Sequence, residues 1–151
     1  MAENSKTRQR SDYGYFLSYR TRWSDNDQYG HMNNSIYYHL FDSIVNTYLI
    51  EQCGLKPKES PLIGLVVSSY AQFFAPVGFP QILELGLRVN KLGKSSVTYE
   101  VGVFEQEKDR PSAVGGYTHV FVDNDTRKSS AMAKETRDGL DKLVGPSPAK
   151  L

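Results

Sequence analysis

The sequence predicts an α+β fold in which one long helix packs against one face of a curved antiparallel sheet of about five to six strands. The chain of 151 residues is long enough for one domain with a substantial core. Apolar residues recur with helical spacing over residues 35–52, and they alternate with polar residues in several segments after residue 64. Those later segments are joined by short turns, which is typical of antiparallel strands.

The long helix is the clearest single element. At about 100° per residue its apolar and polar residues separate onto two faces. One face carries Tyr37, Leu40, Phe41, Ile44, Val45 and Tyr48, and the other carries His39, Asp42, Ser43, Asn46 and Thr47. Gly54 and Pro57 then indicate where the helix stops.

Strands are predicted before and after this helix. The segment from Tyr15 to Trp23, "YFLSYRTRW", is rich in aromatic residues and partly alternating. Further strands are expected at 64–74, 81–90, 95–105 and 113–123, followed by a weak helix at 131–144. Polar residues 1–14 and the Pro- and Gly-rich residues 145–151 are expected to be flexible tails, which leaves 15–144 as a single domain.

Composition restricts the function. Lys and Arg number 18 against 17 Asp and Glu, and the net charge of +1 gives no indication of nucleic acid as a partner. No apolar run reaches the roughly 18 residues of a membrane span, and the N-terminus has no apolar segment typical of a secretory signal. The single cysteine, Cys53, excludes an internal disulfide and fits a buried apolar position. A cytoplasmic location is the default expectation.

The segment "SDNDQYGHMNN", residues 24–34, places many polar groups where a strand gives way to the helix. One interpretation is helix capping, because Asn33, Asn34 and Ser35 are good N-cap residues and an acid favours the positive helix end. The alternative is an active site. Three other chemistries fit less well: the spacing of Asp25, Asp27 and His31 matches no standard metal site, Ser68-Ser69 lie within a strand rather than a nucleophile elbow, and "GLRVNKLGK" lacks phosphate-loop spacing.

The run Trp23-x-Asp25-x-Asp27-x-x-Gly30-His31-x-Asn33-Asn34 resembles the hotdog-fold acyl-CoA thioesterases of the 4-hydroxybenzoyl-CoA thioesterase type. The segment "NKLGKSSVTYEV" is similar to the family's glycine-serine turn, and "THVFVDNDTRK" is similar to its last strand. The resemblance covers roughly residues 15–128. It implies a hotdog fold, a long helix wrapped by an antiparallel sheet.

The resemblance also implies roles for four residues of this segment. Asp27 matches the family's catalytic carboxylate, which is nucleophile or general base, and Gly30 matches the turn glycine. The backbone N–H near Asn34 matches the donor that holds the thioester oxygen at the helix start. His31 stands where many relatives carry an apolar residue; it could orient a water molecule or simply pack the turn. Asp42 on the helix is a second candidate acid, because another hotdog subfamily has its acid there.

Coenzyme A would add phosphates, for which basic residues are expected. Arg88, Lys91 and Lys94 cluster around the turn at 90–95, where the resemblance places the nucleotide, and Ser95 and Ser96 could add hydroxyl or backbone contacts. Arg127 and Lys128 are a weaker version of the same pattern. The alternative interpretation of all these residues is a solvated basic turn.

The function predicted from the sequence is hydrolysis of an acyl-CoA thioester to free acid and coenzyme A, without a separate cofactor or metal. Two alternatives stay open: a thioesterase acting on acyl-carrier protein, and a non-catalytic acyl-CoA-binding hotdog protein. A homodimer or homotetramer is expected, since one helix and one sheet leave an open strand edge. The C-terminal Ala149-Lys150-Leu151 differs by one residue from a peroxisomal address, so a peroxisomal location is expected if the source is eukaryotic.

Overall fold

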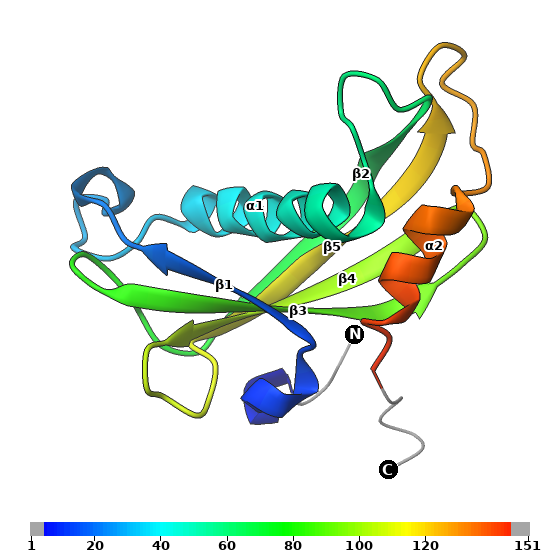
Figure 1. The fold of residues 1–151 in the computed structure, drawn as a ribbon. Helices are drawn as coiled ribbons and strands as arrows, with labels where there is room; N and C mark the ends of the chain where they lie inside the picture. The colour runs from blue at the N-terminus through cyan, green and yellow to red at the C-terminus, as the bar shows by residue number, and fades with distance from the viewer. Residues whose placement is uncertain (1–4, 146–151) are drawn as a thin grey trace.

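The computed structural model describes residues 5–145 and contains one five-stranded antiparallel sheet with the strand order β1-β3-β4-β5-β2 (Figure 1). The predicted α+β hotdog fold is confirmed, with one long helix packed against this sheet. The elements are β1 (Tyr15–Arg20), α1 (Asn34–Cys53), β2 (Leu62–Phe73), β3 (Ile82–Leu92), β4 (Ser96–Glu105), β5 (Ala113–Asp123) and α2 (Lys134–Asp141), with three short 3₁₀ helices, η1 (Ser5–Thr7), η2 (Arg10–Asp12) and η3 (Trp23–Asp25).

Helix α1 buries the apolar face that its sequence predicts. All six of the predicted apolar residues are buried, with Leu49 and Cys53 continuing the same face toward the helix end. Asn33 caps the N-terminus, and Gly54 ends the helix in the left-handed conformation at φ 71°, which suits a residue without a Cβ atom. At 1.5 Å per residue, the 20 residues make α1 roughly 30 Å long.

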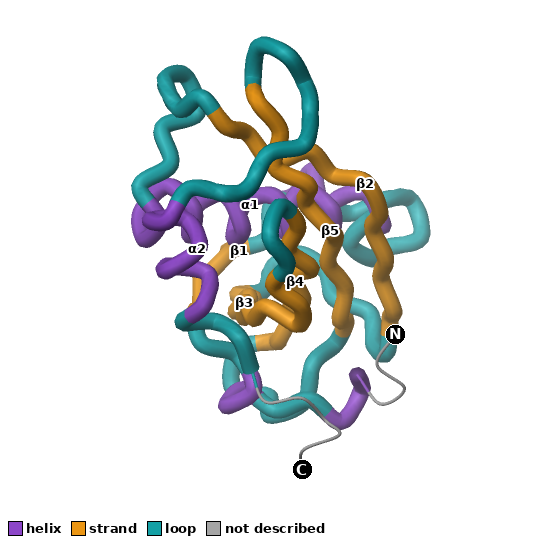
Figure 2. The backbone as a smooth tube through the Cα atoms, turned by 90° about the vertical axis from the view of Figure 1, so that its right-hand side faces the viewer, coloured by secondary structure: helices purple, strands orange, loops and turns teal. Residues whose placement is uncertain are grey.

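The sheet has an inner face, which packs against α1, and an outer face on the opposite side. Side chains alternate between these faces along each strand. On β3 and β4, Leu83, Leu85, Leu87, Val89, Val97, Tyr99, Val101 and Val103 form the inner core and are all fully buried. Figure 2 shows β2 beyond β5, at the edge of the sheet. No helix of the described part is long and apolar enough to cross a membrane.

The N-terminal segment differs from the sequence prediction. Residues 5–14, expected to be a flexible tail, form η1 and η2 and pack against the outer face of the sheet (Figure 1). Tyr13 is only 5% exposed, and the Arg8 side chain forms an ion pair with Glu100 at 2.8 Å. The prediction of a flexible tail failed because the residues that Arg8 and Tyr13 contact lie about ninety positions away in the sequence. No local sequence pattern indicates such contacts.

Helix α2 confirms the weak helix expected near residues 131–144. It packs beside the end of α1, where the Tyr48 hydroxyl donates a hydrogen bond to the Gly139 carbonyl at 2.5 Å. The chain then pairs with β3, because the Val89 N–H donates to the Leu143 carbonyl at 2.9 Å. Of the predicted C-terminal tail only Gly145 is described, and the Ala149-Lys150-Leu151 tripeptide lies outside the described residues.

One polar cluster is built into the core between α1 and β5. His119 is 4% exposed and is hydrogen-bonded through Nδ1 to the Tyr99 hydroxyl at 3.1 Å. A Cβ atom on Gly64 of the neighbouring strand β2 would lie 2.7 Å from His119 Nδ1, so the ring fills this space completely. Burial lowers the pKa of His119 to about 4, although the Asp42 carboxylate on α1 opposes the shift.

This burial predicts a loss of stability in mild acid. The folded pKa of about 4 lies below the ordinary value of 6.5, so the unfolded chain binds a proton that the native protein does not. The free energy of unfolding should therefore fall between pH 6.5 and 4, by up to about 3 kcal/mol from this residue alone.

The measurement is urea unfolding across that pH range for the wild type and for His119→Gln. Glutamine keeps a hydrogen-bonding group for Tyr99 but does not titrate, so the variant should lose less stability on acidification. Parallel pH dependence in the two proteins would show that His119 is not the responsible group.

Candidate functional site

The loop formed by residues 21–33 is held in shape by the hydrogen bonds of one buried carboxylate, that of Asp25. Asp25, at the end of η3, is 0% exposed, and its carboxylate accepts hydrogen bonds from the Tyr19 hydroxyl at 2.5 Å and from the Arg22 N–H at 2.8 Å. Burial alone would raise the pKa of Asp25, but the hydrogen bonds from Tyr19 and Arg22 outweigh it and lower the pKa. Asp25 is therefore committed to holding the loop.

Asp27 lies two residues later in a more open position. Its Oδ1 accepts from the Tyr29 N–H at 2.9 Å, and its Oδ2 accepts from the Asn33 side-chain amide at 3.1 Å. The backbone turns sharply here: the Gly30 N–H donates to the Asp27 carbonyl, and Gly30 has φ 84°, a conformation that a side chain resists. The carboxylate is half-buried and fixed by two donors while part of it stays accessible.

Asn33 connects this carboxylate to the helix. Its Oδ1 accepts from the Ser35 N–H at 3.0 Å, which caps α1, while its Nδ2 donates to Asp27. The sequence indicated only the capping role of Asn33. Its second role could not be derived from spacing, because it depends on the Gly30 turn bringing Asp27 back toward the helix start.

The start of α1 is open to an incoming group. Among the described residues, no hydrogen-bond acceptor is found for the N–H of Asn34, the first helical residue. Unpaired N–H groups at a helix N-terminus carry partial positive charge and hold anionic oxygens well. Beside them lies a cleft of about 320 Å³, lined by His31, Met32, Asn34, Tyr37, Phe73, Phe74, Ala75 and Pro76.

The cleft has an aromatic wall and a polar rim. The rings of Tyr37 and Phe73 meet edge to face at 4.9 Å, and burial raises the pKa of Tyr37 to about 12, which keeps its phenol neutral. His31 is exposed and lines the rim. The structure thus brings together four of the predicted site residues: Asp27, Gly30, His31 and Asn34.

Arg88 lies apart from these four residues and is buried. Its prediction as a nucleotide ligand was wrong. The residue is 2% exposed and points to the outer face, where it donates to Asn90 Oδ1 at 2.8 Å and to the Asp12 carbonyl at 3.1 Å. The alternation of β3 explains the error. Position 88 is out of phase with the inner residues and lies beneath the N-terminal segment, which was expected to be mobile.

The remaining predicted nucleotide ligands gather at one turn. Lys91 and Lys94 are exposed, and the turn itself is closed by the Gly93 N–H donating to the Ser96 carbonyl at 2.8 Å. The Ser129 hydroxyl donates to the Ser95 hydroxyl at 3.2 Å, so the segment after β5, with Arg127 and Lys128, lies beside this turn. The structure therefore unites the two basic segments that the sequence indicated separately.

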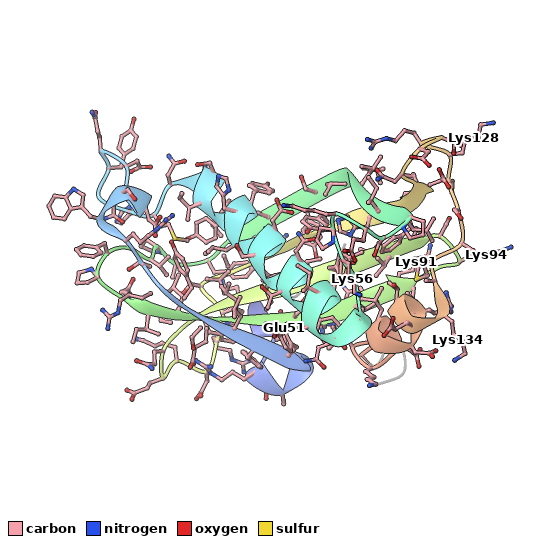
Figure 3. The ribbon with its side chains drawn as sticks, turned by 45° about the horizontal axis from the view of Figure 1, so that its top comes forward. Glu51, Lys56, Lys91, Lys94, Lys128 and Lys134 are labelled. Carbon is pink, nitrogen blue, oxygen red and sulfur yellow. The ribbon has the colours of Figure 1, made fainter. Side chains whose placement is uncertain are left out.

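This basic turn is far from Asp27 within one chain. The loop 21–33 lies beside the start of β3, since the Thr21 N–H donates to the Gln81 carbonyl, whereas the turn follows the end of β3. Figure 3 shows Lys91, Lys94, Lys128 and Lys134 on the side of the molecule toward which the C-terminal end of α1 points. With a rise of about 3.3 Å per residue, β3 separates the two by roughly 33 Å.

The structure also places two residues of the polar face of α1, one of which, Asp42, is the second candidate acid. Asp42 lies on α1 near the hydroxyl of Tyr117; burial raises the pKa of Tyr117, and the Asp42 carboxylate raises it further. His39 is exposed on the same helix. Within residues 5–145, no three His, Cys, Asp or Glu side chains gather as a metal site, and Asp25, Asp27 and His31 do not converge on a common point.

Solved structures share this fold. The PA5185 protein from Pseudomonas aeruginosa is 47% identical, with a TM-score of 0.89, and the match covers 92% of this chain and 97% of that one. The 1,4-dihydroxy-2-naphthoyl-CoA thioesterase from Synechocystis is 15% identical with a TM-score of 0.77, covering 87% and 98% of the two chains. The gentisyl-coenzyme A thioesterase BH1999 is 19% identical with a TM-score of 0.73, covering 83% and 99%.

A search of curated proteins gave no match. A family model described as the thioesterase-like superfamily matches residues 21–140, which include the Asp27 loop, all of α1 and the sheet from β2 to β5. The chain belongs to the thioesterase-like superfamily.

Proposed function

We propose that this protein hydrolyses an acyl-CoA thioester to a free carboxylic acid and coenzyme A, with Asp27 as the catalytic carboxylate. The superfamily supports thioester hydrolysis as the reaction class. The observation that carries the finer proposal is the arrangement around Asn33, whose amide nitrogen donates to Asp27 while its carbonyl oxygen caps α1, next to a cleft that His31 and Asn34 line. The resemblance to the 4-hydroxybenzoyl-CoA thioesterase type agrees with this assignment.

The arrangement provides both groups that thioester hydrolysis needs. The thioester carbonyl oxygen becomes negative when its carbon is attacked, and the N–H of Asn34 at the positive end of α1 is placed to stabilise it. The Asp27 carboxylate either attacks the carbonyl carbon, giving a mixed anhydride that water then cleaves to the free acid, or removes a proton from a water molecule that attacks the carbonyl directly. Coenzyme A leaves as a thiolate, which is a good leaving group and takes up a proton from solvent.

A complete site in this proposal requires two copies of the chain. Edge strand β2 has a free side, and its residues Leu65, Val66 and Val67 are 38%, 49% and 59% exposed. Pairing of β2 with a second β2 about a two-fold axis would bury these residues and satisfy the unpaired edge. The partner's α1 would then run in the opposite direction, which carries the partner's basic turn toward the Asp27 end of this chain. The remote basic turn thus supports a nucleotide site shared between copies.

Two alternatives are separated by one assay. An acyl-carrier-protein thioesterase would use the basic turn against an acidic protein, and a non-catalytic module would bind acyl-CoA without releasing thiol. Thiol release from a panel of acyl-CoAs and acyl-carrier proteins distinguishes them. The panel should include aromatic acyl groups, because the cleft wall is built from Tyr37, Phe73 and Phe74.

The first prediction from this proposed function concerns the two acids of the loop. Asp27→Asn keeps the size and the hydrogen-bonding shape of the side chain but removes its charge, so kcat should fall by about 100- to 10,000-fold with little loss of stability. Asp25→Asn is the matched control, since it breaks the loop's buried hydrogen bonds and should instead cost about 1–3 kcal/mol of stability.

Steady-state thiol release and urea unfolding on both variants provide the test. Asp25→Asn should retain more activity than Asp27→Asn at a temperature where both are folded. Equal losses of kcat, or an active Asp27→Asn, would remove Asp27 from the catalytic role.

The basic turn gives a second prediction. Lys91→Ala combined with Lys94→Ala should raise KM for acyl-CoA by about two- to tenfold with kcat unchanged, because exposed contacts to phosphate act equally on bound substrate and transition state. The wild-type KM should rise with salt more steeply than that of the variant. A short thioester without the nucleotide should be hydrolysed equally by both proteins. Lys6→Ala combined with Lys108→Ala, at two exposed lysines outside the basic turn, serves as the control for lost surface charge, and identical KM values in all three proteins would place the phosphates elsewhere.

The third prediction concerns assembly. Val67→Lys puts a charge on the free edge of β2, at a residue that is already exposed in one chain, so the fold should persist while pairing is lost. Light scattering should show a two-chain mass for the wild type and a one-chain mass for the variant, with thiol release from acyl-CoA lost together with pairing. A fully active one-chain form would exclude the shared site.

A further inference from the structure

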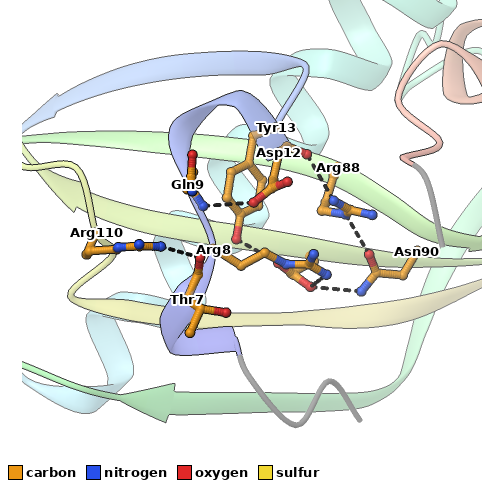
Figure 4. Close-up of polar contacts among 9 residues, drawn as sticks. Thr7, Arg8, Gln9, Asp12, Tyr13, Arg88, Asn90 and Arg110 are labelled. Atoms are coloured by element: carbon orange, nitrogen blue, oxygen red, sulfur yellow. Dashed lines mark hydrogen bonds and ion pairs between the residues drawn. The ribbon is translucent and has the colours of Figure 1, made fainter. Parts of the chain in front are cut away.

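The outer face of the sheet is covered by the chain's own N-terminal segment. Residues 5–14, which we call the N-terminal strap, cross β3 and β4 on the side opposite α1 (Figures 1 and 4). By the alternation of the strands, the residues beneath it are Glu84, Gly86 and Arg88 of β3 and Glu100, Gly102 and Phe104 of β4. These positions would face solvent if the segment were a free tail.

A notch in the sheet receives the strap. Gly86 and Gly102 are directly paired between β3 and β4, and the ring of Tyr13 lies on both. A Cβ atom on Gly102 would lie 2.7 Å from Tyr13 Cζ, and one on Gly86 would lie 2.8 Å from Tyr13 Cβ. Tyr13 also packs edge to face on Phe104, with ring centroids 5.8 Å apart. Two adjacent glycines therefore make room for one aromatic side chain.

A buried carboxylate then fixes the strap. Glu100 is 0% exposed, and its two oxygens accept from Arg8 Nε at 2.8 Å, Arg8 Nη2 at 3.0 Å, the Tyr13 hydroxyl at 2.6 Å and Asn90 Nδ2 at 3.0 Å. Burial alone would raise the pKa of Glu100, but these hydrogen bonds outweigh it and lower the pKa. Three of the four donors belong to the strap, so these three hydrogen bonds hold it on the sheet and would be lost if it were lifted.

Further contacts hold the strap along its length. Arg10 donates to Glu84 Oε1 at 2.6 Å and to the carbonyls of Lys108 and Glu105, and Arg110 donates to the Thr7 carbonyl. The Gly14 N–H donates to the Leu87 carbonyl and continues the strap into β1. The strap is thus a folded layer of the domain.

We propose that the N-terminal strap reserves the outer face for the chain itself, so that assembly uses the β2 edge alone and stops at two copies. With α1 on the inner face and the strap on the outer face, neither face of the sheet can pack against a second sheet. Without the strap, the Gly86–Gly102 notch and Phe104 would be uncovered among three charged side chains, and this side of the sheet would be free to pack against another pair of chains. The strap therefore acts as an intramolecular competitor against stacking of one pair of chains on another.

The test compares two truncations by light scattering from micromolar to millimolar concentration. Removal of residues 2–14 deletes the strap, whereas removal of residues 2–4 leaves it intact and is the matched control. We expect a two-chain mass for the wild type and the short truncation at every concentration. The long truncation should show a mass that rises to twice that value or more.

A milder variant keeps the test valid if the long truncation does not fold, as judged by circular dichroism. Arg8→Ala combined with Tyr13→Ala should loosen the strap, seen as faster hydrogen exchange at the Tyr13 and Gly14 amides, and should raise the mass in parallel. Lys6→Ala is its control, because it removes an exposed charge of the strap. Two results would overturn the proposal. One is an unchanged mass for a variant whose strap is loosened, and the other is a wild type that assembles beyond two copies while the amides of residues 13 and 14 stay protected from exchange. A one-chain wild type would contradict the β2 pairing instead, and the rise in mass on truncation would still test the strap.

Discussion

The burial of the apolar face of α1 against the inner face of the sheet fixes everything else in this domain. Ile44 and Phe41 are fully buried at its centre, and the leucines of β3 meet them from the sheet. At roughly 25 cal/mol per Å² of apolar surface, contacts on this scale dominate the stability of a domain of this size. Because the helix cannot rotate or slide without exposing this face, its N-terminus is held in one place. A second anchor lies just before it, where the Met32 N–H donates to the Val77 carbonyl at 2.8 Å.

The polar residues of the site are arranged around the N-terminus of α1, and the two acids among them differ in their contacts. Asp25 is buried, accepts donors from two sides and shapes the loop, while Asp27 is only partly buried and is joined to the helix start through Asn33. Two acids separated by one residue therefore occupy different environments. The difference comes from the loop geometry, since Asp25 ends a 3₁₀ turn and points inward, whereas Asp27 begins the turn that Gly30 closes.

Local patterns predicted what depends on neighbours in sequence, and they missed what depends on distant ones. The faces of α1, the strands and the Asp27 loop follow from spacing, caps and turn residues, so they could be derived. Arg88 was misplaced because a cation near a turn is usually exposed, and only the strap above it makes that position buried. Asn33 was seen as a cap but not as a partner of Asp27, since that contact needs the three-dimensional turn. The distance between Asp27 and the basic turn likewise requires the direction in which β3 runs.

The double use of Asn33 limits how this region can change. Aspartate and serine are both good substitutes at the first cap of a helix, so selection for helix stability alone would accept either of them. Aspartate has no proton to donate and would place a second negative charge against Asp27, and serine has one oxygen for the two contacts that Asn33 makes with separate atoms. Tolerance at this position is therefore set by the neighbouring acid and not by the helix. A mutational scan scored for folding and one scored for turnover should diverge most sharply at Asn33, where one amide caps the helix with its oxygen and contacts the proposed catalytic acid with its nitrogen.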